Sequence, residues 1–233
     1  MRLNIFLLAL ILNIETSTTN CSVALAEDGE VIQSIAMNEG YKHAEQLLPF
    51  IQKMFVETGI ELRTIDAIAV SSGPGSYTGL RIGIASAKGM AFALDKPLIA
   101  INSLEIMTHQ VIQAFPNYEY YIPMLDARRM EVYTAIYDSI LQPKLKTLSV
   151  IVDTETFLEQ TQNMPVVFFG DGSMKCLETF ANRSNYKHLQ GIFPNAEYMA
   201  SLTYKSYLET QFVSLAYLEP NYLKKFFTQQ SSN

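Results

Sequence analysis

Cysteine and histidine are scarce in this sequence, and tryptophan is absent. The 233 residues include two cysteines, Cys21 and Cys176, and three histidines. The cysteines lie far apart, no Cys-x-x-Cys pair occurs, and no two histidines are four residues apart. These patterns argue against a disulfide framework and against a helix carrying two histidine ligands, so we predict no metal site. A reducing, cytoplasmic location fits so few thiols.

Basic residues are also in the minority. Lysine and arginine number 17 against 23 aspartates and glutamates, which gives a net charge of −6. Because nucleic-acid binding normally needs a clustered basic surface, the chain alone is not expected to bind nucleic acid. Low-complexity tracts are missing and 48% of the residues are hydrophobic, which predicts an ordered globular protein with one large domain or two small ones.

No apolar run is long enough to span a bilayer. Residues 3–14 follow Met1-Arg2 and resemble a short signal peptide, and Ala24-Leu25-Ala26 resembles a cleavage site. However, the polar residues 15–22 separate the two features, which is a poor layout for a signal peptide. We therefore predict no membrane association, a buried strand over 8–16, and a short extension, Met1–Leu7, ahead of it.

The first half of the chain predicts the order βββαβαβ. Alternating or apolar runs predict strands over 8–16, 21–26, 31–37, 67–71 and 97–101. Helical spacing predicts helices over 43–58, stopped by Gly59, and over 77–94. Ser103 is the expected N-cap of a third helix.

The composition shifts after Phe115, and the second half predicts another α/β unit. Its strands are expected up to residue 125 and over 131–137, 144–152 and 165–169. Its helices are expected from a cap at Asp153 or Thr154 to Gln160, and over 174–181 and 196–208. We therefore predict an α/β fold with two subdomains, 1–102 and 103–233, and the last helix can pack back on the first.

A glycine-rich turn links the strand over 67–71 to the second helix. Gly73-Pro74-Gly75-Ser76-Tyr77-Thr78-Gly79 is one residue too long for the dinucleotide fingerprint, and no Gly-Lys-Ser/Thr follows it. Gly73 and Gly75 allow a sharp turn in front of a helix. The turn is either a phosphate loop or a corner that orients the helix, and the missing spacing favours the corner.

Both helices carry more apolar surface than one core contact needs. On the first, apolar residues recur at 44, 47, 48, 51, 54 and 55. On the second, Gly79, Gly83 and Ala87 form one small-residue stripe, and Ala85, Gly89 and Ala93 form another. Small residues at that spacing let another helix approach closely. Either both helices are buried within the chain, or each packs its own sheet on one side and a partner protein on the other.

Two polar clusters remain. Glu15-Thr16-Ser17-Thr18-Thr19 follows the first strand and is either an anion-binding loop or a turn closed by side-chain-to-backbone bonds. The charged cluster Asp126, Arg128, Arg129 and Glu131 is either a salt-bridged β-turn or a contact for an anion or a partner. If the strand is continuous there, residues 126 and 128 share one face and residues 129 and 131 do not share it.

Three segments together resemble the bacterial TsaB (YeaZ) family. They are Ile11-Leu12-Asn13-Ile14-Glu15-Thr16-Ser17, then the run from Ser72 to Gly83, then Asp126-Ala127-Arg128-Arg129-Met130-Glu131-Val132-Tyr133. The resemblance implies an ASKHA (actin-like, Hsp70-like, ribonuclease H-like) fold. It also implies a role in making N6-threonylcarbamoyladenosine at position 37 of tRNAs that read ANN codons.

The family resemblance further implies a non-catalytic subunit. Its partners are a catalytic paralogue, TsaD, and an ATPase, TsaE, with tRNA engaged only through the complex. TsaD-like chains carry two metal-binding histidines where this chain has Ser103 and Met107. When the partner is absent, the exposed apolar helices are expected to pair in a homodimer. The residues expected at the TsaD interface are His43, Leu47, Phe50, Ile51, Met54, Tyr77, Thr78, Arg81, Ile82, Ala85, Ser86 and Gly89.

No cofactor is expected on the isolated chain, and ATP or ADP is expected only at the partner interface. The residues considered near such an anion are Glu15, Thr16, Ser17, Gly73, Gly75, Ser76, Arg128 and Arg129. The alternative is an ASKHA-type small-molecule kinase with phosphate loops at 15–19 and 170–173, using Glu15 and Asp171. A peptidase is disfavoured because no nucleophile–base pattern is evident.

Overall fold

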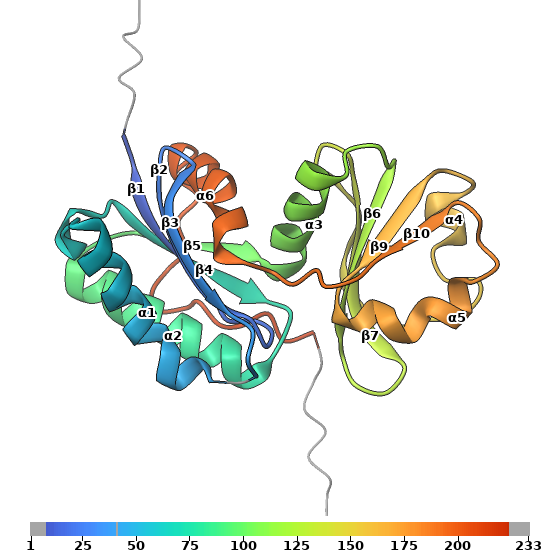
Figure 1. Cartoon of the computed structure of the whole chain (residues 1–233), viewed down its shortest axis with the longest axis horizontal. Helices are drawn as coiled ribbons and strands as arrows, with labels where there is room; N and C mark the ends of the chain where they lie inside the picture. Colours follow the sequence, from blue (N-terminus) through green and yellow to red (C-terminus); the bar gives the residue numbers. More distant parts are fainter. Residues whose placement is uncertain (1–7, 41, 224–233) are drawn as a thin grey trace, which may run out of the picture.

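The computed structural model describes residues 8–40 and 42–223, so the Met1–Leu7 extension lies outside the described residues. The described chain forms two five-stranded sheets in two neighbouring lobes (Figure 1). The first sheet has the order β3-β2-β1-β4-β5. Its strands are β1 (Leu10–Glu15), β2 (Cys21–Glu27), β3 (Glu30–Met37), β4 (Ala67–Gly73) and β5 (Leu98–Asn102). The pairs β1–β2 and β2–β3 are antiparallel, whereas β1–β4 and β4–β5 are parallel.

The second sheet repeats this topology. Its order is β10-β9-β6-β7-β8, so the first three strands of each lobe form an antiparallel meander and the next two add in parallel beside the first. The strands are β6 (Tyr120–Asp126), β7 (Glu131–Asp138), β8 (Pro143–Ile151), β9 (Val166–Phe169) and β10 (Tyr186–Leu189). The chain is therefore built from two lobes of the same strand order.

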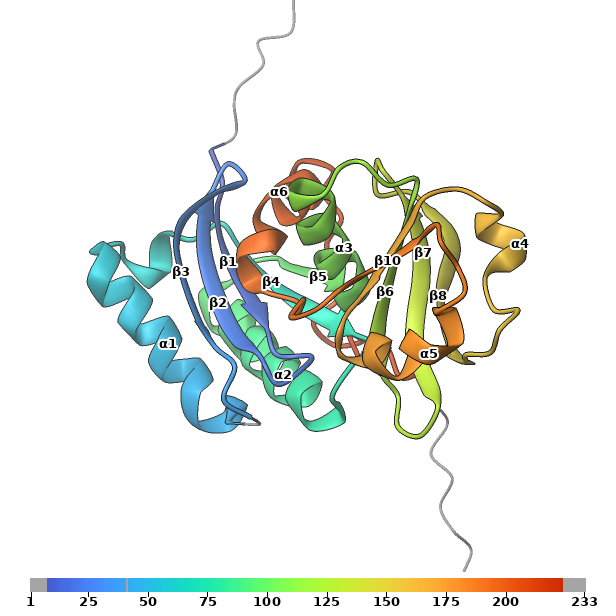
Figure 2. The same cartoon turned by 45° about the vertical axis from the view of Figure 1, so that its right-hand side comes forward.

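Helices cover both faces of the first sheet. α1 (His43–Thr58) and α2 (Tyr77–Leu94) lie on one face, and α6 (Ala200–Leu208) lies on the other (Figures 1 and 2). α3 (Ser103–Ala114) lies between the two sheets (Figure 1). Within the described residues, no helix is both long enough and apolar enough to cross a membrane.

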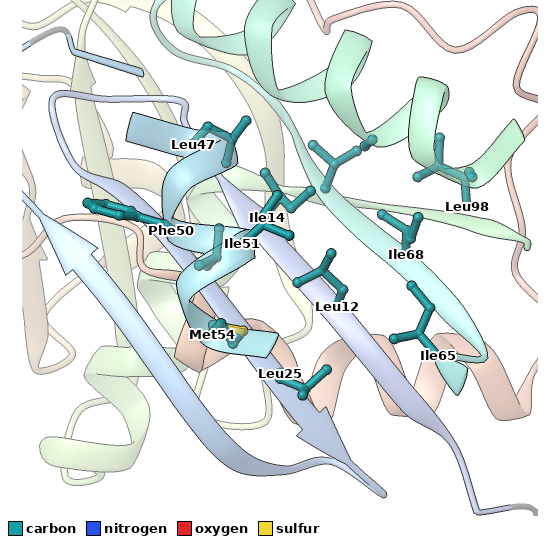
Figure 3. Close-up of a cluster of buried hydrophobic side chains, with 14 of the residues drawn as sticks. Leu12, Ile14, Leu25, Leu47, Phe50, Ile51, Met54, Ile65, Ile68 and Leu98 are labelled. Atoms are coloured by element: carbon teal, nitrogen blue, oxygen red, sulfur yellow. The ribbon is translucent and has the colours of Figure 1, made fainter. Parts of the chain in front are cut away.

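The largest core cluster lies under α1 and α2. Leu12, Ile14 and Ile68 from the sheet meet Leu47 and Met54 from α1 (Figure 3). A second cluster on the other face of the sheet joins β1, β4 and β5 to Met199 and the residues around α6. The first lobe is therefore a three-layer sandwich whose last layer comes from the end of the chain.

Beyond α6, residues 212–222 return to the first lobe, and we call them the C-terminal segment. Val213 donates its backbone N–H to Leu98 O, which covers the outer edge of β5. Leu215 and Leu218 pack on the core beneath α2. Asn221 N then donates to Ser72 O at 2.8 Å, so the segment ends beside the glycine-rich corner.

Several predicted elements differ in the structure. Asn102, not Ser103, caps α3, because its side chain accepts the Leu104 N–H at 2.8 Å. The helix expected from Asp153 or Thr154 to Gln160 shrinks to α4 (Leu158–Thr161), because Asp153 binds the backbone of residues 155 and 156 and closes a separate turn.

The remaining differences concern the end of the second lobe. The helix expected over 174–181 is a 3-10 turn, η2 (Asp171–Cys176), followed by α5 (Leu177–Phe180). The segment predicted over 196–208 likewise starts as η3 (Ala196–Met199), and a short η1 (Leu62–Thr64) precedes β4. Strand β10 was missed because it is an edge strand of four residues with a polar centre, Lys187 and His188.

Candidate functional site

The glycine-rich corner is packed directly against the loop that follows β1. Ser76 caps α2, since its Oγ accepts the Gly79 N–H at 3.2 Å. Ser76 N donates to Ser17 O at 2.6 Å, and Thr16 Oγ1 donates to Gly79 O at 2.9 Å. A Cβ at Gly75 would lie 2.2 Å from Ser17 O, so only glycine permits this approach.

This packing decides between the two interpretations of the corner. The Ser17 amide donates to Glu15 Oε1 at 2.5 Å, and the Ser76 amide is bound by Ser17 O. These two N–H groups are therefore already used inside the protein rather than offered to an anion. These contacts support the favoured interpretation of the corner as a turn that orients α2, and they support the interpretation of the 15–19 loop as a turn closed by side-chain-to-backbone bonds.

Glu15 is fully buried, and burial raises the pKa of its carboxyl to about 7, against an ordinary value of 4.5. Hydrogen bonds from Ser17 and Ser71 lower the pKa and offset part of that effect. Glu15 is also absent from the lining of the cavity described below. A buried carboxyl of this kind is poorly placed as the metal carboxylate of a kinase, so the structure does not favour that alternative.

Replacing Glu15 by Gln should change how stability depends on pH. Because the folded-state pKa lies above the unfolded value, the carboxyl contributes stability that is fully present below about pH 4.5 and lost as the pH rises to about 7. Denaturant unfolding at pH 5 and pH 8 should show wild type losing about 2–3 kcal/mol more than Glu15→Gln over that interval. Equal losses in the two proteins would contradict a buried, protonated Glu15.

A cavity of about 960 Å³ lies between the two lobes. Its wall on the first lobe comes from residues 17–18 and 75–78, and its wall on the second from residues 125–129, Glu131, Tyr133 and Asp171. Asn221 and Tyr222 of the C-terminal segment complete it. Of the residues considered near an anion, Ser17, Gly75, Ser76, Arg128 and Arg129 line the cavity, whereas Glu15, Thr16 and Gly73 do not.

The charged cluster on the far wall is the tip of the β6–β7 hairpin. Arg128 and Arg129 both have left-handed backbones, with φ of 69° and 52°, so the chain turns here and the expected strand alternation does not apply. Lys175 holds the tip: its Nζ donates to Asp126, to Arg129 O at 2.8 Å and to Glu131 O at 2.6 Å. The ion pair of this turn is thus with Lys175, which the sequence did not indicate.

Asp171 stands at the base of the same hairpin. Its Oδ1 accepts the Asp126 N–H at 3.0 Å, and burial raises the pKa of its carboxyl. The carboxyl thus fastens the start of the turn, and this hydrogen bond gives it a structural role.

The outer face of α1 and α2 is the second candidate site. Five residues expected at the partner interface are instead buried, because this stripe of α1 faces the sheet: His43, Leu47, Phe50, Ile51 and Met54. The last four belong to the core cluster drawn in Figure 3. His43 is also fixed by a 2.7 Å contact from Nε2 to Thr18 O. The open face of α1 carries Leu48, 57% exposed, and Val56, 74% exposed.

On α2 the two small-residue stripes face opposite ways. Gly79, Gly83 and Ala87 are buried, and Gly79 and Gly83 touch Thr16 so closely that no side chain fits. Ala85, Gly89 and Ala93 are exposed, and nothing lies within 4 Å of a Cβ placed on Gly89. Phe92, 81% exposed, extends this outward stripe. Of the other expected interface residues, Thr78 and Arg81 are exposed and Tyr77, Ile82 and Ser86 are half-buried.

A serine–histidine pair occurs in the second lobe, but its geometry does not suit a nucleophile. Ser173 Oγ donates to Gly170 O at 2.6 Å and lies 2.8 Å from His188 Nε2. Because the single hydroxyl proton is given to a backbone carbonyl, the histidine must donate to the serine rather than activate it. Ser173 is also fully buried. The pair therefore joins β10 to the turn after β9.

Within residues 8–40 and 42–223, no group of three or more His, Cys, Asp or Glu side chains could hold a metal ion. Ser103 and Met107, at the positions compared with metal-binding histidines, are both fully buried in α3. Neither a hydroxyl nor a thioether is a good substitute for imidazole toward a hard or borderline metal.

Comparison with known proteins gives a consistent picture. The family model described as TsaD, tRNA N6-adenosine threonylcarbamoyltransferase, matches residues 38–154. The tRNA threonylcarbamoyladenosine biosynthesis protein TsaB of Haemophilus influenzae is 32% identical, with 95% of this chain and 94% of that protein covered. A tRNA N6-adenosine threonylcarbamoyltransferase of Erythrobacter litoralis is 45% identical over a shorter stretch, 35% of this chain and 23% of that protein.

A solved structure agrees with the sequence comparisons. YeaZ from Pseudomonas aeruginosa superposes with a TM-score of 0.78 at 28% identity, covering 92% of this chain and all of that one. Together with the duplicated strand order, this supports an ASKHA-type fold of two lobes.

Proposed function

This chain belongs to the TsaB family of tRNA threonylcarbamoyladenosine biosynthesis proteins, and we propose that it acts there as a non-catalytic subunit. In this proposal it binds a TsaD-type catalytic paralogue and activates it. The paralogue transfers the threonylcarbamoyl group to N6 of adenosine 37 in tRNAs that read ANN codons. The tRNA meets this chain only within the complex, in keeping with the net charge of −6.

The open face of α1 and α2 is the observation that carries the proposal. Ala85, Gly89 and Ala93 form an exposed stripe of small residues along α2, with exposed Phe92 beside it and exposed Leu48 and Val56 on α1. An apolar patch of this kind on a globular protein usually marks a protein contact. Small residues four apart let a partner helix pack closely, so we propose that helices of the paralogue cover this face.

The chemistry of the chain supports a non-catalytic role. Ser103 and Met107 are buried and offer no imidazole, and Glu15 is enclosed by its own loop. We infer that metal binding and group transfer belong to the paralogue. This chain instead supplies a rigid surface, because α2 is held in place by the corner at Ser76 and the loop at Ser17.

The proposed complex has further components besides the paralogue. A TsaE-type ATPase joins the complex, and ATP or ADP binds only where this chain meets the paralogue. A second copy of the chain can cover the open face when the paralogue is absent, as a symmetric dimer. The isolated chain is expected to show no ATP binding in the micromolar range by calorimetry.

Reconstitution tests the proposed function. The chain is co-purified with its cognate TsaD-type protein, and threonylcarbamoyl transfer to tRNA is assayed with and without it. We expect a stable complex, transfer only when both proteins are present, and none by this chain alone. Failure to form the complex, or full transfer by the paralogue without this chain, would sink the proposal.

A further inference from the structure

Arg81 lies on α2 four residues before Ala85, and its exposed side chain contacts two tyrosines. Its guanidinium carbon lies 3.8 Å from the centre of the Tyr77 ring, and Nε donates to Tyr222 Oη at 3.0 Å. The two tyrosine rings are themselves 4.9 Å apart. Arg81 is thus held by one residue of its own helix and one from the C-terminal segment.

No carboxylate of the described residues forms an ion pair with Arg81. Its Nε donates to Tyr222, and a guanidinium has five N–H donors, so it can also bind a carboxylate through its two terminal nitrogens. Arg81 also precedes Ala85 by four residues, which places it about one helical turn, or about 6 Å, along α2 from the exposed stripe of small residues. Among residues 8–40 and 42–223, the cation therefore stands next to the apolar face without a carboxylate paired to it.

We propose that Arg81 is the polar anchor of the partner surface and binds a carboxylate on the helix of the paralogue that packs on the exposed stripe Ala85, Gly89 and Ala93. This inference rests on the proposed function, and it adds the chemistry that the partner helix must carry: small or apolar residues facing the stripe and one Asp or Glu about a turn away. Arginine is favoured at the centre of protein interfaces because its fork pairs with carboxylates while its plane stacks on aromatic rings.

Tyr222 is a positioning residue in this scheme. An arginine that is free in solution loses side-chain entropy when a partner immobilises it, and a pre-stacked one loses less. Asn221 N bonds to Ser72 O immediately before Tyr222, so the end of the C-terminal segment is fixed where the ring must stand. By fixing Tyr222, the C-terminal segment holds Arg81 in place and so raises the affinity of this surface for the partner.

The test measures the affinity of the full chain for its cognate paralogue by calorimetry, using Arg81→Gln, Arg81→Lys, Tyr222→Ala and the double variant Arg81→Gln/Tyr222→Ala. Lys187→Gln is the matched control, because it removes one exposed cation from β10 in the other lobe. Melting temperatures establish that each variant is folded.

We expect Arg81→Gln to weaken binding about tenfold or more, and Arg81→Lys to recover little of that loss because a lysine lacks the bidentate fork. Tyr222→Ala should weaken binding by about three- to fivefold in the wild-type background and cause no further loss beside Arg81→Gln. Wild-type affinity should also fall more steeply with salt than that of Arg81→Gln, whereas Lys187→Gln should bind like wild type.

The outcomes separate this inference from the proposed function. If wild type binds the paralogue and Arg81→Gln binds as tightly, the anchor is wrong and the proposed function stands. If Tyr222→Ala costs the same affinity with and without Arg81, its positioning role is wrong. If wild type itself does not bind, the proposed function fails first.

Discussion

Ala85→Glu is expected to lower the affinity for the TsaD-type paralogue by at least about 100-fold while leaving the chain folded. Ala85 is exposed in the free protein, so the new carboxylate meets water there and its melting temperature should change by no more than a few degrees. In the complex the same carboxylate would be enclosed by the partner helix, and pairing it with Arg81, one turn earlier, would take that cation from its proposed partner. Calorimetric titration with the paralogue measures the loss.

The matched control is Ala114→Glu, which makes the same change at an exposed position of α3. It should bind the paralogue like wild type. Comparable affinity for Ala85→Glu and wild type would place the partner elsewhere, whereas unfolding of Ala85→Glu would mean that this face of α2 is buried within the chain after all.

Gly79→Ala is expected to destabilise the isolated protein by about 3 kcal/mol or more. A Cβ at this position would lie 2.1 Å from Thr16 O and 3.1 Å from the His43 ring, so α2 must move away from the loop that follows β1. The first of these contacts is with backbone, which cannot step aside as a flexible side chain can. Denaturant unfolding monitored by circular dichroism gives the free energy.

Gly89→Ala is the control on the same helix. Nothing lies within 4 Å of its added Cβ, and alanine has the higher helix propensity, so the protein should gain up to about 1 kcal/mol. The two substitutions are chemically identical, and only the packing of each face distinguishes them. Equal effects at the two positions would contradict the assignment of an inner and an outer stripe.

Local signals in the first half of the chain were sufficient to place its elements. Gly59 ends α1 in the left-handed conformation, with φ of 68°, and Asp28 and Gly29, both with positive φ, form the turn that separates β2 from β3. In the second half the signals were weaker. Strand β10 has four residues around a polar centre, and its place is decided by parallel pairing with β9, about twenty residues earlier. Missing it also hid the repeated strand order of the two lobes.

For the candidate sites too, the sequence pattern predicted part of the arrangement and the packing of the chain decided the rest. Spacing along α2 revealed two small-residue stripes, but both have the same period, and helical periodicity cannot say which one meets the sheet. For α1 the expected interface residues lay on the stripe that the sheet covers, so His43, Leu47, Phe50, Ile51 and Met54 were wrong as surface residues. Leu48 and Val56, which lie outside that stripe, are exposed instead. Phe92 and Ala93 continue the outward stripe and could have been included on spacing alone.

The sequence by itself determined the family, the α/β class and the sharp corner before α2, because each depends on residues adjacent in the chain. The spacing of the glycines at 73, 75, 79 and 83 can be recognised from the sequence alone. Only the tertiary structure shows which residues the glycine-rich turn contacts. Thr16 and Ser17 lie about sixty residues away, and their hydrogen bonds to Gly79 and Ser76 support the interpretation of the corner as a turn that orients α2.

The anchor at Arg81 depends on a still longer separation. Tyr222 lies 141 positions further along the chain, and no local pattern indicates that it would meet Tyr77 and Arg81. Periodicity reports which residues share a face of one element, whereas contacts between distant elements follow from how the whole chain packs. For this protein, tertiary packing therefore decided which face of α2 is exposed to solvent and placed Arg81 between Tyr77 and Tyr222 beside that face.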